Sequence, residues 1–356
     1  MDRGKKPAKA TKKPDLNQRM DIRGIIRENA LRFLPAKALC RCKAVCRDWK
    51  LQISAPFFVH NQSHSFRSVS GVFCQAPMCQ PSFIPLDPMA YGVPDSQLSF
   101  LPELVKIKSS CNGLLCCQGY SSEKPYYICN PVNKQYKKLP KPSSYHGTDP
   151  AVVLIFEPSP LDFIPSFKLI CAFPSADLDN ACEFEMYSSS QDSWKMFREI
   201  FFGKIPKSGV HVNGVIYWQA VPNGLLAFDL VNDRCRIITS YDSAGALGMV
   251  NGKLCSGVAI PGSIQVRVLS NTFANTARMG HKVNIWEVIE KIGVGKTHPS
   301  SKIHVLCVEG DVVIYRVSSS VLCFNLKTKK LSDLSTGAEY DSRHVFVHYV
   351  NSLVAI

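Results

Sequence analysis

A repeated turn signal constrains the fold of this chain more than any other feature of its sequence. Asn112-Gly113, Asn213-Gly214 and Asn251-Gly252 each stand directly before an apolar run. Asn-Gly favours a two-residue hairpin turn, because both central residues of that turn need a positive φ. Weaker copies of the unit occur at Glu309-Gly310 and Val350-Asn351. The recurrence predicts a chain built largely from repeated β-hairpins.

A second unit, an apolar strand followed by a polar turn, comes about 16–18 residues after the first where both can be traced. It occupies residues 128–134, 227–233 and 323–329. If one degenerate copy near residue 160 is allowed, the hairpin unit recurs about every 48 residues between Asn112 and Asn351. This period is typical of one four-stranded propeller blade.

Short β-rich runs separated by Gly, Pro, Asn, Asp and Ser continue from about Phe66 to the end of the chain. Many short strands at this spacing indicate a sandwich, a barrel or a propeller, and the repetition favours a propeller of roughly six blades. The strand at 344–349 is expected to close the ring beside one of the first strands, because closure removes exposed sheet edges. The clearest runs are SVSGVFC, LLCCQGY, PYYICN, AVVLIFE, FKLICAF, CEFEMYS, GVIYWQAV, LLAFDL, KLCSGVAI, IQVRVLS, VNIWEVI, KIHVLCVE, VVIYRV, VLCFNL and HVFVHYV.

Residues 22–60 show a helical pattern instead. Apolar residues recur at helical spacing in two segments that meet at Pro35, which can end one helix and begin the next. Pro56 is expected to end the second helix. A segment of about 40 residues is too small to bury much surface alone, so its apolar faces should dock onto something else. The apolar positions are Ile22, Ile25, Ile26, Ala30, Phe33 and Leu34 in the first helix, and Leu39, Cys42, Cys46, Trp49 and Ile53 in the second.

The order of motifs in this segment resembles an F-box. The matching steps are Leu34-Pro35, Lys37-Ala38-Leu39, Arg41-Cys42, Val45-Cys46-Arg47-Asp48-Trp49, Ile53 and Pro56-Phe57. The initial Leu-Pro of the pattern is replaced by Ile22-Arg23, followed by Gly24. The resemblance implies that the segment binds a Skp-type adaptor and, through it, a cullin-based ubiquitin ligase. The adaptor-binding residues it implies are Ile22, Ile25, Ile26, Leu34, Pro35, Leu39, Val45 and Trp49.

The β-rich part resembles the F-box-associated and Kelch-like β-propellers that follow F-boxes in plants. The residues that carry the resemblance are 110–116, 130–134 with Leu139-Pro140, and 187–194. The resemblance implies that loops at one end of the ring hold a target protein, although no substrate-binding residue can be named. The expected fold is mainly β with a small N-terminal α domain. The expected domains are a disordered basic tail (1–19), a helical F-box (20–62) and a propeller (66–356).

The net charge of +14 is concentrated at the front of the chain. Residues 1–19 hold seven Lys and Arg against two Asp, and residues 20–60 hold eight against three acidic residues. The long β-rich part is therefore nearly balanced, which argues against a broad nucleic-acid surface there. The N-terminus lacks an apolar core, and no apolar run approaches about 18 residues. We therefore expect neither a secretory signal nor a membrane span, and a location in the nucleus or cytoplasm.

Two motifs that could hold a metal or a nucleotide are better explained otherwise. Cys42 and Cys46 with His60 and His64 have nearly zinc-finger spacing, but the two cysteines fall on a predicted helix. The run at 293–297 resembles the end of a phosphate-binding loop, but its first glycine is replaced by a glutamate. No metal or cofactor is expected. Most of the fifteen cysteines lie in apolar runs, where a thiol behaves as a small buried hydrophobe; examples are Cys116, Cys117, Cys171, Cys255, Cys307 and Cys323.

No catalytic constellation is found, so the chain is expected to be a non-catalytic adaptor rather than an enzyme. Two alternatives stay open. One is a propeller enzyme or small-molecule sensor acting outside a ligase, which would need convergent polar residues at the central channel. The other is a nucleic-acid-associated protein that uses the basic first 60 residues, whose binding would weaken steeply as salt rises.

Overall fold

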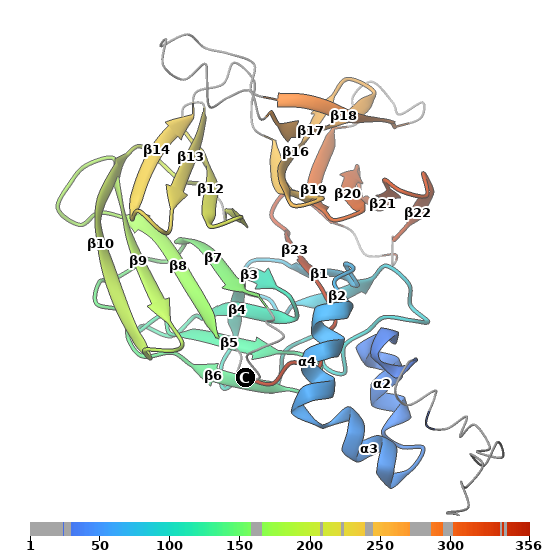
Figure 1. Cartoon of the computed structure of the whole chain (residues 1–356). Helices are drawn as coiled ribbons and strands as arrows, with labels where there is room; N and C mark the ends of the chain where they lie inside the picture. The colour runs from blue at the N-terminus through green and yellow to red at the C-terminus, as the bar shows by residue number, and fades with distance from the viewer. Residues whose placement is uncertain are drawn as a thin grey trace, which may run out of the picture.

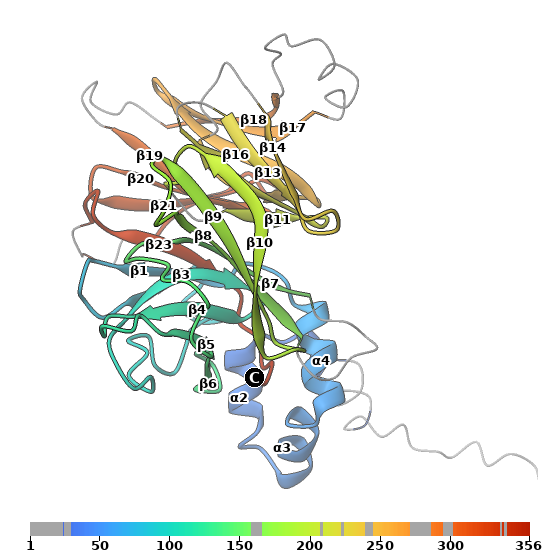
Figure 2. The ribbon, with the colours of Figure 1, turned by 90° about the vertical axis from the view of Figure 1, so that its left-hand side faces the viewer.

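The helical elements gather at one end of the molecule, beside the C-terminus (Figures 1 and 2). The computed structural model describes residues 24, 30–157, 166–206, 209–221, 224–238, 245–270, 286–294, 302–334, 337 and 340–356. The expected tail at 1–19, Ile22, Ile25, Ile26 and the degenerate turn near 160 lie outside these ranges. The helical elements are η1 (Leu31–Phe33), α2 (Ala36–Cys42), α3 (Arg47–Ile53) and α4 (Pro56–Ser65).

The expected single helix after Pro35 was wrong, because it is broken between α2 and α3. Cys46 has an extended backbone (φ −160°, ψ 167°), and its Sγ accepts a hydrogen bond from the amide of Trp49 at 3.4 Å. Cys46 thus caps a new helix instead of continuing the old one. Pro56 follows the end of α3 as expected, but it also occupies the first turn of α4, a helix that the sequence pattern did not indicate.

Three four-stranded antiparallel sheets follow one another along the chain, and each uses consecutive strands. The first contains β3 (Val105–Cys111), β4 (Leu114–Gly119), β5 (Tyr126–Asn130) and β6 (Gln135–Lys138). The second contains β7 (Ala151–Phe156), β8 (Phe167–Pro174), β9 (Ala181–Ser188) and β10 (Ser193–Phe202). The third contains β11 (Val210–Val212), β12 (Val215–Ala220), β13 (Gly224–Asp229) and β14 (Arg234–Ile238).

An eight-stranded sheet follows, made of two antiparallel halves that meet where Met249 on β15 pairs in parallel with Glu309 on β19. One half contains β15 (Ala246–Val250), β16 (Lys253–Ile260), β17 (Ser263–Leu269) and β18 (Trp286–Gly293). The other contains β19 (Ile303–Glu309), β20 (Val312–Val317), β21 (Ser320–Asn325) and β22 (Leu331–Asp333). The described part of the chain is thus mainly β and propeller-like, but it does not divide into six separate sheets.

The last strand closes the ring, as the sequence predicted. β23 (Val345–Tyr349) pairs antiparallel with β1 (Gly71–Gln75), which pairs in turn with β2 (Ser82–Pro85). The innermost strands then touch in a circle: β23, β3, β7, β11, β15, β19 and β23 again. Each of these six strands thus lies beside two others, although β3, β7, β11 and β23 are each the end strand of their own sheet.

The three Asn-Gly turns are confirmed. Both residues have positive φ in each: 45° and 95° at Asn112-Gly113, 49° and 80° at Asn213-Gly214, and 50° and 70° at Asn251-Gly252. Gly310, in a weaker copy, also has a positive φ and separates β19 from β20. The copy at Asn351 was wrong, because Asn351 follows β23, is fully buried and forms no hairpin.

The second repeated unit is confirmed as a strand followed by a turn, and the Asn or Asp at the end of the strand stabilises that turn. Asn130, Asp229 and Asn325 each end a third strand, and each side-chain oxygen accepts a hydrogen bond from the amide two residues later, at 2.8–3.0 Å. Lys134 and Lys329, which close two of these turns, have positive φ. Short polar side chains stabilise turns in this way, because they replace a backbone acceptor.

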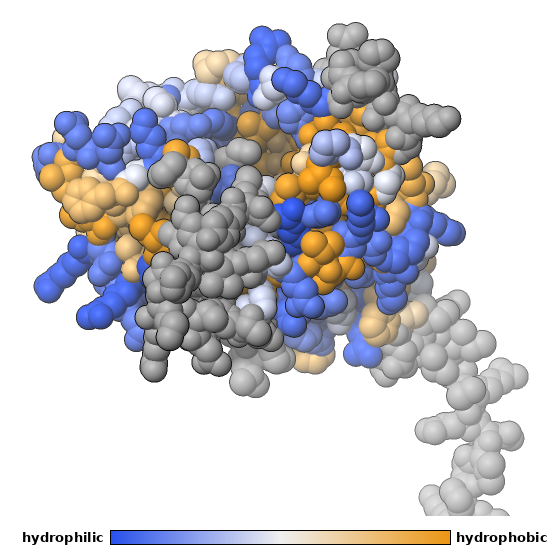
Figure 3. Space-filling model, turned by 90° about the horizontal axis from the view of Figure 1, so that it is seen from above, coloured by the Kyte–Doolittle hydropathy of each residue, from blue (hydrophilic) through white to orange (hydrophobic). Residues whose placement is uncertain are grey.

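The outer strands differ from the inner ones. On β10, Ile200 and Phe202 are exposed, and so is Ile237 on β14. Viewed from above, hydrophobic side chains appear on the left flank of the molecule, the side on which β10 lies (Figure 3). By contrast, all residues of β4 and β5 are buried. The core therefore lies between the sheets, and the outer strands face solvent.

Candidate functional site

The helical segment packs directly against the propeller. Leu31, Ala36, Leu39 and Ile53 share one hydrophobic core with residues of β1, β3, β4, β5 and β23. The Nζ of Lys37 also donates to the carbonyls of residues 88 and 91, at 2.6 and 3.3 Å. The expectation that the helical faces dock onto another surface is confirmed, and that surface belongs to the same chain.

The residues that the F-box resemblance implies as adaptor contacts differ in how far they are exposed. Leu39 is fully buried in the shared core, and Leu34 and Trp49 are half-buried against it. Pro35 is half-buried at the start of α2. Val45, in the turn between α2 and α3, is 64% exposed. Of the described residues in this set, Val45 is the one that most clearly faces solvent.

Three further apolar side chains of the helical segment are exposed, although the F-box resemblance did not imply them as adaptor contacts. Phe33, Leu51 and Phe57 are each more than half exposed. Phe57 was recognised in the F-box pattern but given no role. Together with Val45 they form what we call the exposed helical residues. Of these, Phe33, Val45 and Leu51 are exposed apolar side chains next to a packed face, where a partner can contact them.

The last residues of the chain join the helices to the propeller. Gln62 on α4 accepts a hydrogen bond from the amide of Leu353 and donates to the carbonyl of Leu34, both at 3.4 Å. The side-chain amide of Asn130 donates to the carbonyls of Ser352 (2.9 Å) and Val354 (2.8 Å). This C-terminal segment, residues 350–356, therefore holds the helices at the Asn130 end of β5.

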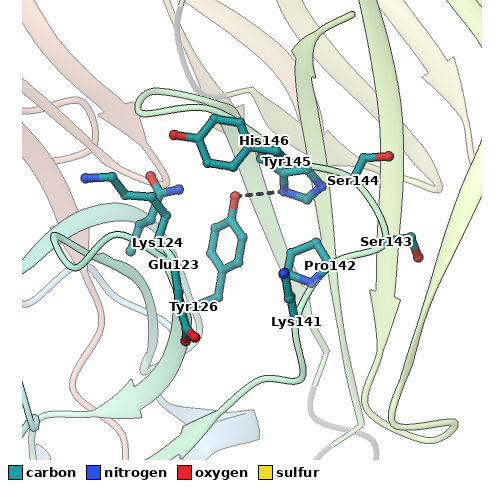
Figure 4. Close-up of a pocket in the computed structure, with 10 residues that line it drawn as sticks. Glu123, Lys124, Tyr126, Lys141, Pro142, Ser143, Ser144, Tyr145 and His146 are labelled. Carbon is teal, nitrogen blue, oxygen red and sulfur yellow. Dashed lines mark hydrogen bonds between the residues drawn. The ribbon is translucent and has the colours of Figure 1, made fainter. Parts of the chain in front are cut away.

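A pocket of about 230 Å³ lies at the other end of β5. Tyr126, the first residue of the strand, forms part of its wall, whereas Asn130 is the last residue. Four residue steps along a strand span about 13 Å. Residues 141–146, which connect β6 to β7, form the opposite wall (Figure 4). The helices and the pocket are thus at opposite ends of this sheet.

A buried chain of hydrogen bonds supports the pocket. The Tyr126 hydroxyl lies 2.9 Å from Nδ1 of His146 (Figure 4), and Nε2 of His146 lies 2.7 Å from a carboxylate oxygen of Glu185. Glu185 is fully buried and also accepts from the amides of Ser143 (2.9 Å) and Ser144 (3.4 Å). His146 and Glu185 are 39 residues apart in sequence, and no sequence motif indicated that they are in contact.

The acid–base state of this chain follows from its contacts. Burial alone would raise the pKa of Glu185, but the hydrogen bonds from His146 and Ser143 outweigh it and leave the pKa lowered. Burial, with negative charge nearby, raises the pKa of Tyr126 well above its usual range, so the phenol keeps its proton. His146 then has both ring nitrogens engaged and stacks on Phe173 at 4.2 Å. The arrangement positions a loop and leaves His146 no nitrogen for a substrate proton.

Residues 94–245 match the family described as the F-box associated beta propeller domain. Three relatives from Arabidopsis thaliana support the assignment. F-box protein At5g49610 is 27% identical over 83% of this chain and 86% of its own length. F-box protein At5g07610 is 28% identical over 60% and 55%, and F-box/kelch-repeat protein At3g23880 is 23% identical over 63% and 70%. The chain is a plant-type F-box protein. Its propeller belongs to the F-box-associated, Kelch-like kind.

The buried thiol beside Tyr126 in this F-box protein is not activated. All fifteen cysteines are free, and burial raises the pKa of Cys171, beside Tyr126, to about 12. The thiolate is the nucleophilic form, so such a thiol is inert near neutral pH. Within the described ranges, no group of three or more His, Cys, Asp or Glu side chains is placed to hold a metal ion. None of the described helices of the F-box protein is long and apolar enough to span a membrane.

Replacing Glu185 by Gln is expected to lower the free energy of unfolding by about 1–3 kcal/mol, because one buried amide or imidazole N–H loses its acceptor. Since the pKa of Glu185 is lowered in the folded protein, its carboxylate stabilises the F-box protein above the pKa of the unfolded chain, about 4.3. That stabilisation is lost as the pH falls below this value. Urea unfolding at several pH values measures both effects.

The control for this prediction is Glu287→Gln, which changes an exposed carboxylate on β18. It should leave stability within about 0.5 kcal/mol at every pH. If Glu185→Gln behaves in the same way as this control, the buried hydrogen-bond chain does not support the pocket.

Proposed function

We propose that this F-box protein is the substrate-recognition adaptor of a Skp-cullin-F-box ubiquitin ligase, working in the nucleus or cytoplasm. Its helical segment binds a Skp-type adaptor, and its propeller holds a target protein. The observation that carries the proposal is the position of the exposed helical residues. They are exposed on the helical segment, whose buried side chains pack against the propeller in one shared core. The membership in the F-box family adds to this support.

The mechanism is positional. The helical segment fixes one end of the protein to the ligase, and the propeller holds the target at the other. Holding two reactants together replaces a bimolecular encounter by a local one and raises the effective concentration of target lysines. In this mechanism the chain brings the reactants together and the chemistry is performed by other components of the ligase.

We further propose that the propeller has six blades. Three blades are the separate four-stranded sheets, and two are the halves of the eight-stranded sheet, which meet at the pair Met249 and Glu309. The sixth is the three-stranded sheet of β2, β1 and β23. The circle of contacts among the six innermost strands supports this count.

The adaptor contact is tested by two variants. Val45→Glu places a charge on an exposed apolar position and should lower retention of a Skp-type adaptor in a pull-down by at least about tenfold, since burying an unpaired charge is costly. The double variant Leu34→Ala with Pro35→Ala should abolish retention and leave the propeller folded. The circular dichroism of both variants should match that of the unchanged protein in the strand region.

Val231→Glu is the matched control, because Val231 is 85% exposed in the turn between β13 and β14, away from the helices. It should retain the adaptor fully. Equal retention by Val45→Glu, by the double variant and by this control would remove the helical segment as the adaptor surface.

A further inference from the structure

A positively charged side chain is buried between two sheets of the propeller. Arg316 lies near the end of β20 and is only 6% exposed. Ile314, two residues earlier and so on the same face of the strand, packs in one buried cluster with Val72 and Ile84 of β1 and β2. Arg316 therefore lies in the seam between the eight-stranded sheet and the sheet of β2, β1 and β23, which are neighbours in the ring (Figure 1).

The guanidinium group of Arg316 uses few of its donors. Nη1 donates to the carbonyl of Tyr340 at 2.8 Å. Nε is buried and has no hydrogen-bond partner, and Nη2 has none within the described part of the chain. Nε and Nη2 form one edge of the planar group, and such an edge can bind two oxygens of a carboxylate or phosphate in parallel. The edge that fits an oxyanion is thus the edge without a partner.

No side chain in the described ranges forms an ion pair with Arg316. Asp341, in the segment before β23, already pairs with Arg343 (2.7 Å) and His344 (2.9 Å). Cys74 of β1 is close enough to be affected by the Arg316 charge, but burial raises the pKa of its thiol to about 12 despite that charge. The thiol therefore stays neutral and does not balance the guanidinium.

The other buried basic side chain shows how a charge is balanced elsewhere in this protein. Lys108 and Arg316 are the Lys and Arg side chains that are buried among the described residues. The Nζ of Lys108 lies 2.5 Å from the carboxylate of Asp149. Removing a charge from water is costly unless an opposite charge or hydrogen bonds compensate for it. Arg316 has one hydrogen bond and no such carboxylate, so an anion that is not part of the described chain would complete its contacts.

The depth of Arg316 limits the kind of anion that can reach it. A side chain carried by a folded partner would have to displace the strands around the guanidinium, because so little of Arg316 is exposed. A free ion of a few atoms meets no such obstacle. The surrounding cluster is apolar and includes Val321 and Leu334, and a charge-assisted hydrogen bond is stronger in such surroundings than in water.

We propose that Arg316 binds a small free oxyanion, a carboxylate or phosphate ion, through Nε and Nη2 in the seam where the ring closes. The bound ion neutralises the buried guanidinium and so stabilises the contact between the two sheets. A ligand that binds the folded state alone raises its stability by mass action. This inference goes beyond the ligase role and does not depend on it, because no adaptor or target takes part.

The test is thermal unfolding of the full chain in a zwitterionic buffer, with sodium chloride replaced stepwise by sodium phosphate or sodium acetate at constant ionic strength. The midpoint should rise by about 2 °C or more with phosphate, acetate or both, and the rise should level off as one site fills. Equilibrium dialysis of the unchanged chain should then find one bound ion per chain. A midpoint that does not change with either ion, or a rise that never levels off, overturns the proposal.

Variants locate the bound ion. Arg316→Met removes the charge and should abolish the rise, and Arg316→Lys keeps the charge without the planar fork and should weaken binding by about tenfold. The matched control is Arg343→Met, because Arg343 is exposed in the segment before β23 and already pairs with Asp341. This control should keep the full rise. A rise in Arg316→Met equal to that of the control identifies an adventitious ion only and overturns the assignment. If Arg316→Met does not fold, the dialysis of Arg316→Lys decides in the same way.

Discussion

Replacing Asn130 by Asp is expected to lower the free energy of unfolding by about 3–5 kcal/mol. The Asn130 amide donates to two buried carbonyls of the C-terminal segment, and its oxygen accepts from the amide of Val132 and the hydroxyl of Tyr349. Aspartate keeps the shape and the acceptor but loses both donors. It also places a buried carboxylate against two carbonyl oxygens. Chemical denaturation followed by tryptophan fluorescence measures the loss.

The chain offers a matched control for this change. Asn325 holds the same place in its own turn, where its side-chain oxygen accepts from the amides of residues 327 and 328. Aspartate already fills the equivalent position at Asp229 and accepts the same bonds. Asn325→Asp should therefore change stability by less than about 0.5 kcal/mol. If Asn130→Asp lowers the free energy of unfolding no more than Asn325→Asp does, the C-terminal segment does not depend on Asn130.

Gly248→Ala is expected to destabilise the protein by about 3 kcal/mol or more, because the change forces the innermost strands of the eight-stranded sheet apart. A Cβ at Gly248 on β15 would lie 1.5 Å from the carbonyl oxygen of Val308 on β19. Backbone cannot yield as a flexible side chain does, and overpacking of this kind moves strands. Thermal unfolding measures the loss, and hydrogen exchange of β15 and β19 should rise.

Gly293→Ala is the comparison for this variant. Gly293 ends β18 in the same sheet, has no heavy atom within 4 Å of an added Cβ and has no positive φ. Its effect should stay within about 0.5 kcal/mol. A Gly248 variant as stable as the Gly293 variant would contradict the close contact between the two halves of the sheet.

The sequence predicts the two middle strands of each four-stranded sheet well and the end strands less well, since the innermost strands β3 and β11 were missed as well as most outer ones. Strands such as β4 and β12 pack on both sides and read as continuous apolar runs. The outer strands β6, β14 and β22 are largely exposed and carry Lys, Arg and Asp, so they lack such a run. Their place is fixed by pairing with the strand before them, which a residue pattern does not reveal.

The turns were predictable for a local reason, and the contacts between distant parts were not. An Asn-Gly pair determines its own φ angles, so three hairpins could be placed from six residues. Asn351 is also an asparagine, but its hydrogen bonds are to Ser70 and Gly92, which are far away in sequence. Leu39 shows the same limit. The helical pattern places it on the apolar face of a helix, but it does not indicate which surface covers that face.

The most direct test of the account is co-expression of the full chain with a Skp-type adaptor, followed by size exclusion at high salt. An interface built on apolar side chains such as Val45 and Leu51 should survive high salt, because screening weakens charge contacts and not apolar burial. We predict a stable one-to-one complex for the unchanged chain and separate peaks for Val45→Glu. A folded chain that elutes apart from the adaptor even before any substitution would contradict the proposed ligase role.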